Sequence, residues 1–191
     1  MDADRTPRPT AVKLAAAAHF AVALAFASIP LVGLAFGADV QAAAEAEVAR
    51  QGQEPSVLAS NGLSFDEHGV AIWAPFTIAG ILAVLGFAAL AGSRIGRIFS
   101  WITLPLVLAA NALIMASNAT ASDTLQGAFD GSDDAGLRSL DATALLDAAY
   151  AAYPDWLPAL ETGRLVIVLI GCVLGVVLLA ARPAREYFRK Q

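Results

Sequence analysis

The chain has 191 residues, of which 58% are hydrophobic and 15% are charged, and its formal net charge is −5 at pH 7. Its single cysteine excludes the paired-cysteine chemistry of four-span thiol oxidoreductases. The net charge averages over segments of opposite sign and indicates no nucleic-acid partner.

Four long segments of the chain lack Asp, Glu, Lys and Arg. They contain 25, 25, 25 and 17 residues and lie between Lys13 and Asp39, His68 and Arg94, Arg97 and Asp123, and Arg164 and Arg182. A helix needs roughly 20 mostly apolar residues to cross a bilayer core of about 30 Å. We therefore predict an all-α fold, a polytopic membrane protein with a bundle of four transmembrane helices in one domain, 1–191.

The four spans are predicted at about 14–36, 71–92, 98–117 and 165–181, joined by two long connections, 37–70 and 118–162. The first apolar run has about 23 residues, more than the 7–15 of a signal-peptide core, so we expect it to be retained. The fourth span is short and is expected to sit nearly upright or to let Arg164 reach out to the interface.

Basic residues predict the orientation, because short loops rich in Lys and Arg stay in the cytoplasm. Nine of the twelve Lys and Arg lie in the N-terminus, the link between the second and third spans and the C-terminal tail. The two long connections carry net charges of −5 and −7. We expect a bacterial plasma (inner) membrane protein with both termini in the cytoplasm and both connections outside, the bacterial source being suggested by the Ala-, Leu- and Arg-rich composition.

Both outer connections are predicted to contain short helices. The first has helix-forming composition over 40–51, with Glu47 and Arg50 three residues apart. In the second, Asp141 is expected to cap a helix that ends at Pro154. One face of this helix collects four apolar residues, Leu145, Leu146, Ala149 and Tyr153. It lies in the outer interface or folds as a cap over the bundle.

Polar and small residues inside the spans are candidates for packing or a cavity. Asn111 lies near mid-membrane, where an asparagine serves as interhelical glue or as a functional group. Gly171 and Gly175 have the GxxxG spacing that brings two helices close, within the bundle or in a dimer. His19 is a possible polar site, with a satisfied structural histidine as the simpler interpretation.

One outer segment resembles a calcium loop in its spacing. Oxygen-bearing side chains occupy positions 1, 3, 5 and 12 of a twelve-residue loop, namely Asp130, Ser132, Asp134 and Asp141. Position 6 is Ala135 where a glycine is usual, position 12 is an aspartate, and Arg138 adds a positive charge. The alternative is a solvated acidic turn that leads into the Asp141 cap, and we expect no metal site elsewhere.

Several kinds of chemistry are excluded or disfavoured. His19 and His68 are predicted on opposite sides of the membrane and cannot ligate one haem together. The spans lack the intramembrane charge that ion-coupled transport requires. Cys172 is expected to be a small core filler. The sequence thus indicates no cofactor and no enzyme.

The leading functional hypothesis is a noncatalytic scaffold or accessory subunit of a membrane complex, with an acidic outer face. Its expected partners are the lipid bilayer and either another protein or a second copy of the chain. The alternative is a lipid- or small-molecule-binding membrane protein, transport-related or not, with a cavity between the spans.

Overall fold

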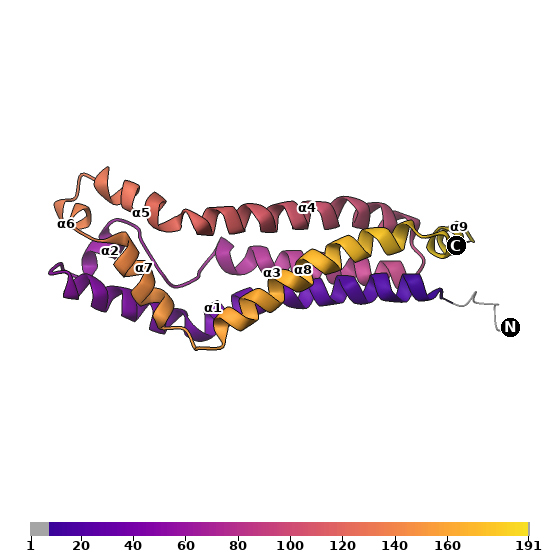
Figure 1. Ribbon diagram of the computed structural model, residues 1–191, viewed down its shortest axis with the longest axis horizontal. Coiled ribbons are helices and arrows are strands. Elements are labelled where there is room, and N and C mark those ends of the chain that lie inside the picture. Colours follow the sequence, from indigo (N-terminus) through magenta and orange to yellow (C-terminus); the bar gives the residue numbers. More distant parts are fainter. Residues whose placement is uncertain (1–7, 191) are drawn as a thin grey trace. The chain divides into compact units, whose positions relative to one another are not determined.

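The computed structural model describes residues 8–190, which form helices and no strand (Figure 1). The predicted all-α fold with four spanning helices is therefore confirmed. The helices are α1 (Thr10–Arg50), α2 (Ser56–Ser60), α3 (Val70–Leu90), α4 (Arg94–Ala119), α5 (Ala121–Asp130), α6 (Ala135–Arg138), α7 (Ala142–Ala151), α8 (Leu157–Ala180) and α9 (Arg182–Lys190).

Four of these helices, α1, α3, α4 and α8, are long and apolar enough to cross a membrane. Each leaves large apolar side chains exposed, among them Leu24, Val84, Leu106 and Val177. Such side chains are stable in contact with lipid and unfavourable in water. The chain is therefore a multi-pass membrane protein by the length, composition and surface of its helices.

The first helix is longer than the sequence indicated. We expected a connection from residue 37 and a separate helix over 40–51, but α1 is one helix of 41 residues, about 60 Å long. Gly37, Ala38 and Asp39 separate the two predicted parts, and the single glycine among them costs too little to break a helix that continues in Ala-rich sequence. The helix ends at Arg50 and is followed by a Schellman motif, in which Gly52 has a φ of 81° that suits glycine and Gln53 N–H donates to Val48 O.

The last spanning helix also differs from its expected bounds. We expected a short span at 165–181, whereas α8 begins at Leu157 and has 24 residues, about 36 Å in length. Pro158 lies in its first turn, where the missing N–H breaks no helical hydrogen bond. The segment therefore has the full length that a bilayer requires.

The chain divides into two compact units, which we describe separately. Among the described residues, the bundle unit comprises 8–28, 73–112 and 159–190. The acidic unit comprises 29–72 and 113–158. Sequence analysis had placed all of these residues in one membrane domain.

Within the bundle unit, α9 packs against the adjoining ends of the spanning helices. Tyr187 and Phe188 are buried with Val12, Ala89 and Leu179, and the Tyr187 hydroxyl donates to Leu90 O at 3.1 Å. The arginines of α9 stay exposed on its other face. This amphipathic helix was not predicted, because it is only nine residues long and mostly polar.

The acidic unit has a hydrophobic core of its own. The core collects buried residues from five helices, among them Val48 of α1, Leu58 of α2, Phe129 of α5, Leu137 of α6 and Leu145 of α7. Fully burying a side chain of this size contributes roughly 1.5–3 kcal/mol. The two long connections thus form a packed structure, and the predicted helix with an apolar face has its buried side here.

Candidate functional site

The surface of the acidic unit carries a large excess of negative charge. The unit contains thirteen Asp and Glu against two Arg, a net charge of −11 with neutral histidine. Nine of the acids are exposed: Asp39, Glu54, Asp66, Asp123, Asp130, Asp133, Asp141, Asp147 and Asp155. The acids thus lie on the outside of a unit whose inside is apolar.

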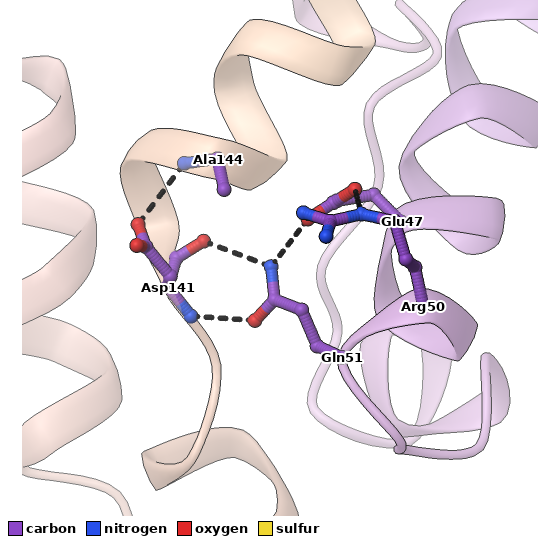
Figure 2. A network of polar contacts seen from close by, with 5 residues as sticks. All are labelled: Glu47, Arg50, Gln51, Asp141 and Ala144. Atoms are coloured by element: carbon purple, nitrogen blue, oxygen red, sulfur yellow. Dashed lines mark hydrogen bonds and ion pairs between the residues drawn. The ribbon is translucent and has the colours of Figure 1, made fainter.

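Gln51 fastens the end of α1 to the start of α7, as Figure 2 shows. Its side-chain Oε1 accepts from the Asp141 N–H at 2.7 Å, and its Nε2 donates to Asp141 O at 3.4 Å. The same Nε2 donates to Glu47 at 2.8 Å, and Glu47 also pairs with Arg50 at 2.5 Å. Glu47 is buried although it is charged. These hydrogen bonds satisfy it and lower its pKa, those from Arg50 first and that from Gln51 second.

Asp141 is the N-cap of α7, as the sequence predicted. Its side chain accepts from the Ala144 N–H at 3.0 Å (Figure 2). From the other side, Gln126 of α5 accepts from the Ala142 N–H at 2.9 Å. The first turn of α7 is therefore held by a cap and by two glutamine side chains, so α7 has a defined place in the unit.

Asp134 links α6 to α2 in a similar way. Its carboxylate accepts from Asn61 Nδ2 at 3.0 Å and from the Gly136 and Leu137 N–H groups at 2.8 and 3.4 Å. These bonds, that from Asn61 first, lower the pKa of Asp134 because they stabilise its charged form.

The candidate calcium loop has a different arrangement in the structure. Asp134 and Asp141 cap two different helices, and Asp130 accepts from Gln126 at 2.9 Å. Ser132 accepts from the Asp134 N–H. Across residues 8–190, no three His, Cys, Asp or Glu side chains come close enough to hold a metal ion. The geometry therefore supports the acidic turn that leads into a helix cap.

Four aromatic residues gather in the acidic unit where α1 lies beside the segment after α7. The ring of Phe36 is 6.4 Å from Tyr153 and 5.9 Å from Trp156, and Tyr150 is 6.0 Å from Tyr153. Tyr150 and Trp156 are about half exposed. Such amphipathic rings favour the boundary between membrane and water.

His19 lies fully buried in the bundle unit and is satisfied on both ring nitrogens. Nδ1 lies 2.7 Å from Ala15 O, and Nε2 lies 3.0 Å from Ser100 Oγ on α4. Ser100 Oγ also lies 2.9 Å from Gly96 O. The Ser100 hydroxyl has one proton and can donate it to one of these two acceptors. It donates to Nε2 when the His19 ring is neutral. It donates to Gly96 O when the ring is protonated and Nε2–H donates to the hydroxyl. The arrangement favours the structural role for His19.

The two glycines of α8 face neighbours within the bundle unit. A Cβ at Gly171 would lie 2.5 Å from Val22 Cγ2 of α1, and one at Gly175 would lie 2.6 Å from Leu104 Cδ1 of α4. Their close partners are therefore intramolecular. Cys172 is buried beside them, and Asn111 lies half-buried on α4 in the same unit.

The residues that sequence reasoning missed are amides. Gln51, Asn61 and Gln126 join helices of the acidic unit, and Gln41 accepts from the Phe65 N–H at 2.7 Å. The Asp141 cap and the Glu47–Arg50 pair, by contrast, had recognisable local patterns. Comparisons of the chain with models of protein families, with curated proteins and with solved structures found no match.

Proposed function

We propose that this chain is a noncatalytic integral membrane protein, a scaffold or accessory subunit, whose acidic unit binds a positively charged surface of a partner protein. The observation that carries the proposal is a unit with its own core that exposes nine acids and holds only two arginines. Charge complementarity of this kind favours encounter with a basic partner and rejects acidic ones.

The fixed arrangement of the unit supports the same function. Binding costs less when the surface is ordered in advance. The hydrogen bonds of Gln51, Gln126 and Asn61 hold α1, α2, α5, α6 and α7 together before any partner arrives. The exposed Tyr150 and Trp156 add the kind of aromatic side chain that is enriched at interfaces.

The proposal includes an orientation. The described basic residues of the bundle unit, except Arg164 of α8, lie where α3 meets α4, at the start of α1 and in α9, among them Arg94, Arg97 and Arg185. By the positive-inside rule these segments belong on the cytoplasmic side of a plasma (inner) membrane, and the Ala-, Leu- and Arg-rich composition favours a bacterial source. The connections 37–70 and 118–162 and their exposed acids are then extracytoplasmic, and so is the domain of the partner that binds them.

The test is co-purification in mild detergent at low and at high salt, comparing two variants of equal charge change. Asp133→Asn with Asp147→Asn removes two exposed acids of the acidic unit, and Glu161→Gln with Glu186→Gln removes two acids of the bundle unit. We expect one basic partner that high salt releases and that the first pair reduces severalfold. Equal recovery in both pairs and at both salt concentrations would contradict the proposal.

The alternative function, binding of a lipid or small molecule by the bundle unit, is favoured by one groove. It lies between α1 and α8, has a volume of about 410 Å³ and is lined by Leu24, Ser28, Leu160, Gly163, Arg164 and Ile167 among others. A Cβ at Gly163 meets open space, so Gly163→Leu should fill the groove without disturbing the helices. Native mass spectrometry that finds the same bound molecules in this variant would exclude the α1–α8 groove as the binding site.

A further inference from the structure

A second groove lies at the basic end of the bundle unit, between α4 and α9. It has a volume of about 800 Å³. Helix α4 contributes Arg94, Arg97, Ile98 and Trp101 to its wall, and helix α9 contributes Arg185 and Arg189. Four cationic side chains and a mainly apolar floor thus line one depression.

Two of these arginines are held in place by the protein. Arg94 donates from Nε to Phe188 O at 2.8 Å and from Nη2 to Arg189 O at 2.5 Å, so it fastens the last turn of α9 to α4. Arg97 donates from Nε to Leu179 O at 3.1 Å, and its guanidinium lies 5.6 Å from the ring centres of both Trp101 and Phe188. The cationic wall is therefore built in advance.

No acidic side chain lines this groove, and Glu186 lines a neighbouring depression together with Arg182, Arg185 and Arg189. The ion pairs of Glu47 with Arg50 and of Asp66 with His68 both lie in the acidic unit. Arg97 and Arg185 are close enough for their charges to repel each other. An anion placed between the arginines would relieve this repulsion and accept several charge-assisted hydrogen bonds.

The floor of the groove requires an apolar partner as well. Ile98 and Ile102 lie four residues apart on the same face of α4 and are both more than half exposed, with Trp101 beside them. They belong to a spanning helix, so this apolar strip continues from the arginines into the membrane. A ligand that matches both parts has an anionic head and a hydrocarbon chain.

We infer that this groove binds an anionic phospholipid, with its phosphate among Arg97, Arg185 and Arg189 and an acyl chain along Ile98 and Ile102. Basic pockets between membrane helices are known to take such headgroups, and arginine forks match the geometry of phosphate oxygens. The inference is independent of the partner proposed for the acidic unit.

The test is native mass spectrometry of the full chain, released from bilayers that contain phosphatidylglycerol and phosphatidylcholine. Arg185→Gln with Arg189→Gln removes two groove charges, and Arg8→Gln with Lys13→Gln removes two charges that do not line the groove. Glutamine has a helix propensity close to that of arginine, so α9 is retained. We expect wild type and control to keep phosphatidylglycerol and the groove variant to lose it about tenfold, a difference near 1.4 kcal/mol.

A second pair of variants tests the apolar floor and keeps every arginine. Ile98→Ser alters the floor, and Ile95→Ser alters an exposed isoleucine of the same helix that does not line the groove. Only Ile98→Ser should weaken phosphatidylglycerol binding. Equal retention of phosphatidylcholine, equal loss in the two charge variants, or full displacement by inorganic phosphate would each overturn the inference, the last because it would show a site for phosphate alone.

Discussion

At Gly171 and Gly163 the surroundings of the glycine determine how a substitution by alanine changes the stability of the fold. In Gly171→Ala the new Cβ would lie 2.5 Å from Cγ2 of Val22, a buried β-branched side chain that cannot turn aside. We expect a loss of about 1–3 kcal/mol of stability from this overpacking. Gly163→Ala, in the same helix with open space, should be neutral or stabilising. Thermal unfolding in detergent compares the two, and equal midpoints would show that α8 does not pack closely on α1.

Ser100 gives a second prediction for a single residue. Ser100→Ala removes the hydroxyl 3.0 Å from His19 Nε2 and leaves a buried ring nitrogen without its partner. The expected loss is about 0.5–2 kcal/mol, the range for hydrogen bonds between membrane helices. Ser28→Ala is the matched control, because the Ser28 hydroxyl donates to Ala25 O of its own helix. If both substitutions shift the unfolding midpoint equally, the bond between α1 and α4 has no specific role.

At the level of helices, sequence patterns predicted the four spans and the capped helix but not every boundary. Long apolar runs and the Asp141 cap are local signals, and both led to helices that the structure contains. The continuity of α1 through Gly37 was missed because charge at Asp39 marks a membrane boundary, which is not a helix end. Helices α5 and α9 are short and mostly polar, and they are helical because they pack on neighbours distant in sequence.

The contribution of the Asp141 N-cap to the stability of α7 can be tested by substitution. Asp141→Ala removes the bond to the Ala144 N–H, which should cost about 1 kcal/mol and speed hydrogen exchange in the first turn of α7. Asp147→Ala removes the same charge from an exposed position inside that helix and should change exchange little. Rapid exchange throughout 142–151 in wild type would show that α7 is not packed in the acidic unit.

The lowered pKa of Asp134 predicts that acid weakens the contact between α2 and α6. Its folded pKa lies below the ordinary value of 3.8, so its contribution to stability is present above that pH and is lost as pH falls through the folded pKa. Asp134→Asn keeps a capping oxygen but loses the charge, and it should flatten this pH dependence. Asp133→Asn, at an exposed neighbour, should leave it unchanged. Hydrogen exchange of 134–139 above and below pH 3.8 measures the difference.

For the whole molecule, the sequence revealed the separation of charge but not the second core. The composition of the two long connections shows their negative net charge, and the functional proposal is based on the acidic surface that follows from it. The side-chain hydrogen bonds of Gln51 and Gln126 join residues that are 90 and 16 positions apart, and no local sequence pattern predicts such pairs. The α4–α9 groove was missed for the same reason, because α9 itself was not expected.

The proposed orientation places the connections 37–70 and 118–162 outside the membrane and the basic N-terminal segment in the cytoplasm. It is tested most directly by labelling intact cells with an impermeant maleimide, using Ser60→Cys and Arg8→Cys in a chain whose buried Cys172 is replaced by alanine. Both positions are exposed. We expect position 60 to be labelled at once and position 8 only after the membrane is permeabilised. Labelling of position 8 in intact cells, or protection of position 60, would contradict the proposed arrangement.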